Sequence, residues 1–341
     1  MPYDQPAAGT PGTDGVYAEV DTDLLHGGRG RSDDTPIARE AEAALAALSR
    51  TGQELPKPGH TRTFVVANQK GGVGKTTTAV NIAAALAQCG AKVLVVDLDP
   101  QGNASTALNV DHHAEVPSIY DVLIERYTME EIVQPVADID GLFCAPATID
   151  LAGAEIELVS MVARESRLQR ALSAYHSSMD YILIDCPPSL GLLTVNAMVA
   201  GDEVLIPIQC EYYALEGLGQ LLRNIELVRA HLNPDLHVST IVLTMYDART
   251  RLASQVADEV RTHFPEQVLR TAVPRSVRIS EAPSYMQTVM TYDPASTGAL
   301  AYREAAREIA ERWAAREGGA GIPAQSDAGR ANTGINAEVG R

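Results

Sequence analysis

A glycine-rich segment near residue 70 has the composition of a phosphate-binding loop. Residues 69–77 read QKGGVGKTT and directly follow an apolar run, FVVAN at 64–68. Glycines let the backbone curl so that successive N–H groups face phosphate oxygens, and a helix that begins here adds its own N-terminal donors. The spacing predicts that Lys75 reaches the terminal phosphates and that the Thr76 hydroxyl holds Mg²⁺. The predicted cradle comprises Gly71, Gly72, Val73, Gly74, Lys75, Thr76 and Thr77.

Lysine is rare in this chain, which makes its use in the loop informative. The sequence has four lysines against 23 arginines, and two of the four are Lys70 and Lys75. A compact ammonium group fits inside a phosphate loop where the planar guanidinium group does not. Gln69 replaces the first glycine of the common pattern GxxxxGK[ST], and Lys70 is an additional cation. The segment is therefore an unusual variant of the common phosphate loop.

Three aspartates lie at the ends of two further apolar runs. Asp97 lies near the end of the strand-like run KVLVVDL at 92–98, and Asp99 directly follows that run. Asp185 ends the run YILID at 181–185. In an open parallel sheet, ligands bind beyond the carboxyl ends of the strands. We therefore expect these carboxylates at the same edge as the phosphate loop. Two acids that follow a strand also suit plain helix capping, and this alternative stays open for Asp97 and Asp99.

The elements that must position these residues alternate along the chain. Apolar runs separated by helical patterns predict an α/β fold, with a mostly parallel twisted sheet and helices on both faces, as in P-loop NTPases. The strand-like runs lie at 64–68, 92–98, 181–185, 203–208 and 238–245. The helical patterns lie near 75–90, 165–175, 191–200, 214–231, 251–263 and 297–316.

Composition and charge exclude several classes of protein. The 341 residues carry 27 basic against 44 acidic groups, a net charge of −17, so the surface is not uniformly suited to nucleic acid. Residues 249–278 differ, because that segment contains six arginines and only three acidic residues. No apolar run approaches ~18 residues, which argues against a membrane-spanning helix. Four scattered cysteines and the lack of a signal sequence predict reduced thiols and a cytoplasmic protein.

Several motifs together resemble one protein superfamily. KGGVGKTT at 70–77 resembles the deviant Walker A motif of the ParA/MinD ATPases. VVDLDPQGNAS at 95–105 and ILIDCPPS at 182–189 resemble its two switch regions. Three further segments resemble the ParA/Soj chromosome-partitioning branch: QCEYYALEG at 209–217, TMYDART at 244–250 and PRSVRISEAPS at 274–284. The likeness covers roughly residues 62–316.

The resemblance implies a nucleotide-dependent homodimer with ATP and Mg²⁺ as cofactors. By resemblance, Lys70 reaches the phosphates of the partner subunit's ATP, so that nucleotide joins two monomers face to face. Asp99 orients the attacking water and is a further candidate for the Mg²⁺ site. Asp185 binds Mg²⁺ through water. The segments that contact the base contain Met245, Pro274 and Arg275.

The resemblance also implies DNA binding and a role in segregation. Arg249 and Arg278 match the arginines with which family members bind double-stranded DNA without sequence preference, and Arg251 and Arg275 are additional candidates. The implied function is a slow ATPase for segregation of the chromosome origin region. A ParB-like centromere-binding partner stimulates hydrolysis and so releases the protein from the DNA. The implied location is the nucleoid, within the cytoplasm, with no membrane contact.

The domain organisation follows from composition and from the extent of the resemblance. We expect a flexible acidic N-terminal extension at 1–60, a ParA-type ATPase domain at 61–316 and a flexible C-terminal tail at 317–341. Within the extension, REAEAALAALSR at 39–50 has the spacing of a short amphipathic helix. The extension is a candidate contact for a polar or cell-division protein.

Other classes of the same superfamily remain as alternatives. A MinD-like membrane switch for division-site placement needs a terminal amphipathic helix with bulky apolar residues, whereas the last predicted helix offers mainly alanine with Ile309 and Trp313. A reductase with an iron–sulfur cluster needs cysteine thiolates brought together at a dimer interface, and none of the four cysteines is placed convincingly for that. A biosynthetic ligase or synthetase is the remaining alternative.

Overall fold

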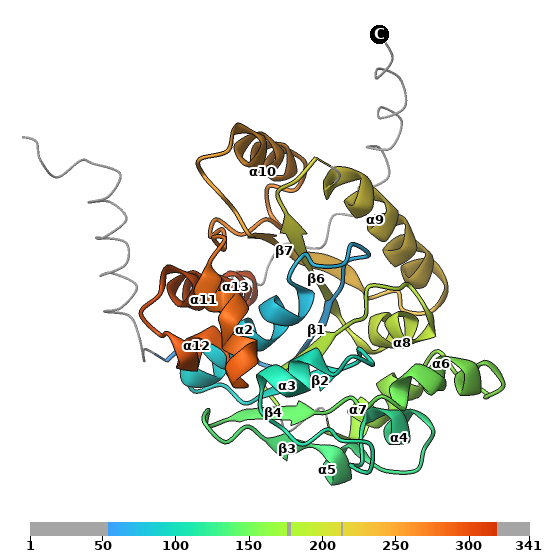
Figure 1. The fold of residues 1–341 in the computed structure, drawn as a ribbon. Helices are drawn as coiled ribbons and strands as arrows, with labels where there is room; N and C mark the ends of the chain where they lie inside the picture. The colour runs from blue at the N-terminus through green and yellow to red at the C-terminus, as the bar shows by residue number, and fades with distance from the viewer. Residues whose placement is uncertain (1–53, 176–178, 213, 319–341) are drawn as a thin grey trace, which may run out of the picture. The chain divides into compact units, whose positions relative to one another are not determined.

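Strands form the central layer of the structure. The computed structural model describes residues 54–175, 179–212 and 214–318 (Figure 1). Its sheet has seven strands in the order β3-β4-β2-β5-β1-β6-β7. The strands are β1 (Arg62–Val66), β2 (Val93–Asp97), β3 (Gln134–Pro135), β4 (Leu142–Ala145), β5 (Tyr181–Asp185), β6 (Glu203–Gln209) and β7 (His237–Thr244).

Parallel pairing in this sheet aligns the strand ends that matter for function. Neighbouring strands run parallel, apart from the antiparallel pair β3 and β4. β1, β2 and β5 are buried along their full length, which explains why their sequences are continuous apolar runs. The register places Val66 and Asp97 on either side of Asp185. The loop after β1 and both acid-bearing strand ends therefore meet at one edge of the sheet.

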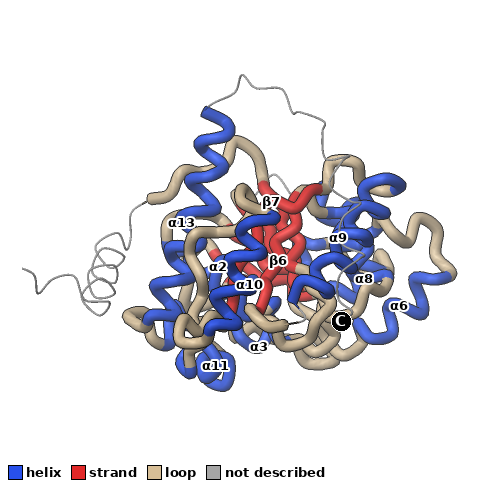
Figure 2. Tube along the Cα trace, turned by 90° about the horizontal axis from the view of Figure 1, so that it is seen from above, coloured by secondary structure: helices blue, strands red, loops and turns tan. Residues whose placement is uncertain are grey.

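Helices cover both faces of the sheet, which lies between them in Figure 2. Phe64 and Val66 of β1 pack in the core that includes α2 (Lys75–Gln88) and α13 (Thr297–Gly318). Val65 of the same strand and Val96 of β2 pack in the core that includes α8 (Leu192–Ala200) and α9 (Ala214–His231). Successive strand residues point to opposite faces, so two apolar cores form. The helices are α2 (Lys75–Gln88), α3 (Asn103–Ala107), α4 (Ile119–Leu123), α5 (Met129–Ile132), α6 (Leu151–Val159), α7 (Arg167–Tyr175), α8 (Leu192–Ala200), α9 (Ala214–His231), α10 (Arg251–His263), α11 (Val277–Glu281), the 3₁₀ helix η3 (Ala282–Tyr285), α12 (Val289–Tyr292) and α13 (Thr297–Gly318).

The predicted α/β fold is confirmed. Each of the five predicted strands is present, with bounds that differ from the prediction by at most two residues. The six predicted helices are also present as α2, α7, α8, α9, α10 and α13. β3, β4 and the helices α3, α4, α5, α6, α11 and α12 were not predicted. Except for the nine-residue α6, these helices have at most five residues, which is too short for a helical period to be recognised, and β3 and β4 have two and four residues.

The predicted terminal segments lie mostly outside the described residues, as does the predicted helix at 39–50. Near the start of the described chain, the Lys57 ammonium lies 3.6 Å from an Asp180 carboxylate oxygen. The His60 ring meets the Trp313 ring edge-on, with 4.9 Å between centroids. Among the described residues, no helix is long and apolar enough to cross a membrane.

Candidate nucleotide site and basic surface

The loop between β1 and α2 has the backbone conformation of a phosphate cradle. Gly72 and Gly74 adopt left-handed conformations, with φ of 74° and 88°, which glycine reaches without steric penalty. α2 begins directly afterwards, and the Thr78 N–H donates to the Gly74 carbonyl at 2.8 Å. The Thr244 hydroxyl at the end of β7 donates to the Val73 carbonyl at 2.8 Å. The loop is thus anchored to the sheet while its first-turn N–H groups stay available to an anion.

Lys75 lies inside this loop among carboxylates. Its side chain is buried, and its ammonium lies 3.5 Å from the Lys70 carbonyl oxygen. Burial lowers the pKa of Lys75, while the negative charges of Asp185 and Asp99 oppose that shift. The carboxylates neutralise the Lys75 ammonium in a place with little water. When a phosphate binds, its negative charge can take over part of that neutralisation.

Asp185 has the surroundings of a group that lacks a cation. The residue is 0% exposed, and within the described chain both of its carboxylate oxygens are buried without a hydrogen-bond donor. Burial and the neighbouring Asp97 raise its pKa well above the usual range, and Thr76 and Lys75 act in the opposite direction. A buried carboxylate that accepts no well-formed hydrogen bond is unfavourable. A divalent cation held by Asp185 and Thr76 would offset that penalty.

The remaining ligands of such a cation would not come from the protein. The described residues contain no group of three or more His, Cys, Asp or Glu side chains that could hold a metal. Mg²⁺ commonly keeps several waters and takes phosphate oxygens as ligands, with one or two protein groups. The residues present therefore fit Mg²⁺ bound together with a nucleotide, and they do not fit a metal held by protein alone.

Asp97 and Asp99 are separated by one residue but have different surroundings. Asp97 is fully buried, and its carboxylate accepts hydrogen bonds from the N–H and hydroxyl of Ser105, at 2.8 and 2.7 Å, and from the Asp99 N–H at 3.3 Å. Burial raises the pKa of Asp97 to about 6, and the bonds from Ser105 oppose the shift. Asp97 is not the N-cap of α3, which is Gly102, but its carboxylate binds Ser105 in the first turn of this helix.

Asp99 is available for chemistry in a way that Asp97 is not. It is 8% exposed, and its carboxylate accepts a main-chain hydrogen bond from the Gln101 N–H at 3.0 Å. Its charge acts on both Lys75 and Asp185, so the three groups lie close together. The structure therefore brings Lys75, Thr76, Asp99 and Asp185 to one edge of the sheet.

The additional lysine of the loop is held by a neighbouring acid. The Lys70 ammonium lies 2.6 Å from one carboxylate oxygen of Glu211, and the Gln209 side chain donates to the other oxygen at 2.6 Å. The Lys70 N–H donates to the Asn68 side chain at 3.0 Å. The segment 209–217 was part of the resemblance, but no role was predicted for Glu211. An acid just after a strand, at the edge expected to carry the site, could have indicated it.

The two predicted base-contacting segments pack against each other. Tyr246 pairs with Pro274 in a parallel bridge, and the Arg275 N–H donates to the Tyr246 carbonyl at 3.1 Å. Met245 reaches the phosphate loop, because a Cβ atom added at Gly74 would lie 3.9 Å from its Cε atom. The two segments therefore lie side by side, and Met245 is the residue that reaches the phosphate loop.

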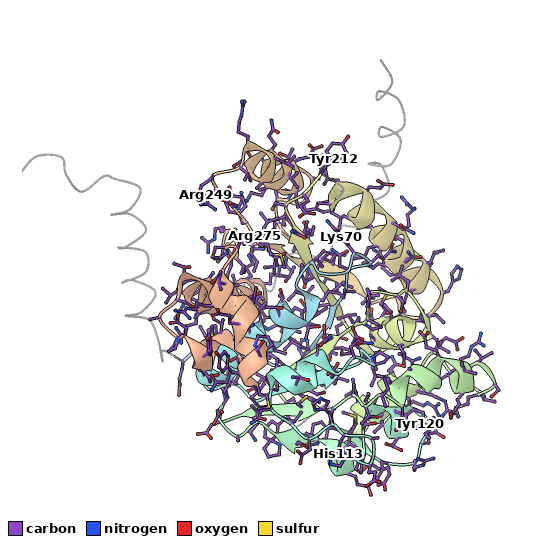
Figure 3. All side chains as sticks on the ribbon, viewed as in Figure 1. Lys70, His113, Tyr120, Tyr212, Arg249 and Arg275 are labelled. Carbon is purple, nitrogen blue, oxygen red and sulfur yellow. The ribbon has the colours of Figure 1, made fainter. Side chains whose placement is uncertain are left out.

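The predicted DNA-contacting arginines are exposed, and two of them are ion-paired. The Arg249 side chain is 89% exposed and donates to both oxygens of Asp247, at 2.9 and 2.8 Å. These bonds lower the pKa of Asp247 to about 2, and the charge of Arg275 acts in the same direction. Figure 3 shows Arg249 and Arg275 on the same side of the structure, near α10. Arg251 is the first residue of α10.

Arg278 in α11 pairs with two acids. Its guanidinium lies 3.2 Å from a Glu281 carboxylate oxygen and 3.3 Å from an Asp293 oxygen. The side chain is still 56% exposed. Arg249 and Arg278 are therefore both exposed at the surface and both paired with nearby acids.

Similarity to known proteins agrees with the motifs. A sequence profile described as an AAA domain matches residues 61–238. The sporulation initiation inhibitor protein Soj of Bacillus subtilis is 52% identical over 247 residues, which cover 72% of this chain and 97% of that protein. The chromosome partitioning protein ParA of Myxococcus xanthus is 50% identical over 251 residues, which cover 74% and 88%. The chain belongs to the Soj/ParA family of chromosome-partitioning ATPases. The predicted family is confirmed.

Solved structures of similar fold place this ParA-family chain in the wider superfamily. Cobyrinic acid a,c-diamide synthase from Mycobacterium smegmatis, solved with an ATP analogue and magnesium, is 40% identical, with a TM-score of 0.65 over 74% of this chain and 96% of that one. The cell division ATPase MinD from Pyrococcus furiosus is 28% identical, with a TM-score of 0.61 over 73% and 98%. Over similar extents, identity is higher to the two partitioning relatives than to either of these proteins.

Proposed function

We propose that this ParA-family chain binds ATP and Mg²⁺, dimerises on the nucleotide and binds DNA to segregate the origin region of a chromosome. The observation that carries the proposal is the buried cluster at the sheet edge. Lys75 lies there beside the carboxylates of Asp99 and Asp185, and within the described part of the chain the Asp185 oxygens are buried without a well-formed hydrogen bond. The solved synthase of similar fold was obtained with an ATP analogue or with ADP, in each case with magnesium.

The chemistry proposed for the site is transfer of a phosphoryl group to water. The loop N–H groups and the Lys75 ammonium bind the phosphates, and Thr76 and Asp185 hold Mg²⁺, the latter through water. Mg²⁺ supplies positive charge that offsets the charge of the phosphate oxygens. Asp99 orients the attacking water. Because a carboxylate beside a triphosphate is a weak base, turnover is slow, and a ParB-like partner would accelerate it.

The dimer proposal assigns two states to Lys70. In the free chain its ammonium pairs with Glu211 at 2.6 Å, and in the nucleotide-bound dimer it leaves this acid for the partner subunit's ATP. The ion pair with Glu211 is half-exposed, so breaking it requires little free energy. The ion pair thus acts as a weak brake on dimerisation.

Replacing Glu211 with glutamine tests this role of the ion pair. The Glu211→Gln variant is expected to dimerise at an ATP concentration about 2- to 5-fold lower than the wild type, because Lys70 no longer has to leave a charged partner. Light scattering during an ATP titration measures the change. Glu216→Gln, an exposed acid in the first turn of α9, is the matched control. A weakened dimer in Glu211→Gln would mean that Glu211 serves the dimer itself.

DNA binding is proposed for the exposed arginines. A dimer doubles the number of cations in residues 249–278, and each phosphate contact releases counterions from the duplex. ATP-dependent dimerisation would therefore increase DNA affinity steeply. The test is a salt titration of binding to a random-sequence duplex with and without ATP. ATP-dependent binding to anionic lipid vesicles in place of DNA would instead favour the MinD-like alternative.

Reversing one arginine charge tests the proposed DNA surface. Arg278→Glu is expected to lower duplex affinity at least about 10-fold at low salt and to reduce the salt slope by about two, since a dimer loses two phosphate contacts. ATP-dependent dimerisation should persist. Arg229→Glu on α9 is the control, because Arg229 is also exposed and paired three residues from an acid, Glu226. If both variants lowered DNA affinity equally, the loss would reflect net charge alone, and Arg278 would not belong to the DNA-binding surface.

A further inference from the structure

The turn that carries Asp99 is closed by a side chain from outside the motif. The Gly102 N–H donates to the Asp99 carbonyl at 2.9 Å, and the Gln101 N–H donates to the Asp99 carboxylate. Gly102 has a left-handed φ of 63° and begins α3. A Cβ atom added there would lie 3.1 Å from the Cδ2 atom of His112 and 3.3 Å from the Ala147 carbonyl oxygen. The His112 ring therefore lies directly against this turn.

Both ring nitrogens of His112 have partners. Nδ1 lies 2.9 Å from the Val110 carbonyl oxygen, which only accepts hydrogen bonds, so Nδ1 carries a proton. Nε2 lies 3.2 Å from the Thr106 hydroxyl oxygen, which also lies 3.0 Å from the Gly102 carbonyl oxygen, so the single hydroxyl proton is donated either to Nε2 or to Gly102. A continuous chain of contacts thus runs from the Val110 main chain through the imidazole ring to the turn.

A pocket lies on this side of the turn, so the support of the turn there comes from the His112 ring. A cavity of about 300 Å³ lies beside the turn, lined by residues 100–102, residues 112–114, Ala147 and Ile149. The adjacent His113 is exposed, and Figure 3 shows it in the lower part of the view, away from Lys70. If the ring of His112 were removed, the pocket would widen beside Gly102, and the turn would be free to move into the added space.

We infer that His112 is a positioning residue for hydrolysis, which holds the turn from Asp99 to Gly102 so that the Asp99 carboxylate meets the attacking water. The inference rests on the proposed function, in which Asp99 orients that water. Its action is indirect, because the ring acts through Thr106 and Gly102. Misplacement of a catalytic group by about 1 Å can lower a rate about 100-fold, so a small movement of this turn is sufficient to change turnover.

Four variants of the full-length chain test the inference. ATP turnover is measured with duplex DNA present, and ATP affinity is measured separately with a fluorescent ATP analogue. His112→Ala is expected to lower turnover about 10-fold with less than about a 2-fold change in ATP affinity. His112→Gln, whose amide can replace Nε2 at Thr106, should recover most of the rate. His112→Asn, whose amide can replace only Nδ1, should not recover it. His113→Ala should match the wild type.

A double variant adds a test of the route through Thr106. Thr106→Val removes the hydroxyl and keeps the shape, so it should lower turnover, and the combination with His112→Ala should lose little more than either variant alone. Wild-type turnover in His112→Ala, an equal loss in His113→Ala, or better recovery with asparagine than with glutamine would overturn the inference. Absence of ATP turnover in the wild-type chain would instead overturn the proposed function.

Discussion

Replacing Lys75 with alanine is expected to abolish ATP binding at working concentrations, with a rise in Kd of about 100-fold or more. The ammonium is the buried cation of the phosphate loop, and losing one partner of a buried charge pair commonly has effects of that size. Equilibrium binding of a fluorescent ATP analogue measures the change. Without bound nucleotide the chain should also fail to dimerise and to stay on DNA.

The same variant needs a control for folding, because Lys75 also offsets nearby negative charge. Asp99 and Asp185 both act on the ammonium, so its removal leaves two carboxylates close together and should lower the melting temperature. Lys75→Gln keeps most of the side-chain volume and separates loss of fold from loss of binding. Lys92→Ala, at an exposed lysine just before β2, should behave as the wild type. Tight ATP binding by a folded Lys75→Ala variant would refute the site.

The fold and the phosphate loop could be predicted because their signals are local and strong. Buried parallel strands require apolar side chains on both faces, so runs such as 181–185 are visible without any knowledge of their neighbours. The loop at 69–77 requires glycine and lysine at fixed spacing, because backbone conformation and phosphate charge both depend on them. Its position after one such run then determined which edge of the sheet would carry the site.

The parts that could not be predicted depend on contacts between distant residues. Asp97 and Asp99 are similar in sequence, and only the position of Ser105 in the first turn of α3 decides that Asp97 is used structurally. Glu211 meets Lys70 across 141 positions of sequence. His112 stands beside a second histidine, and this pair carries no signal for contact with Gly102. Such pairings arise from tertiary packing and have no local pattern.

The contrast between Asp97 and Asp99 leads to the second large expected effect. Asp99→Ala should lower ATP turnover at least about 100-fold, the range expected for loss of a group that orients or activates water. ATP affinity should remain, because the loop and Lys75 are unchanged. The ATP-bound dimer should then accumulate and stay on duplex DNA. Phosphate release, light scattering with ATP and retention on immobilised DNA measure the three parts of this result.

Asp97 provides the control because it lies two residues away and has a different role. Asp97→Ala removes the acceptor of two bonds from Ser105, so it should lower the melting temperature and weaken binding and turnover together. Asp99→Ala should instead lower turnover and leave ATP binding intact. The Asp99 carboxylate accepts one bond from its own turn and otherwise acts on Lys75 and Asp185. If Asp99→Ala hydrolysed ATP at the wild-type rate, the attacking water would need another partner, and the inference on His112 would fail with it.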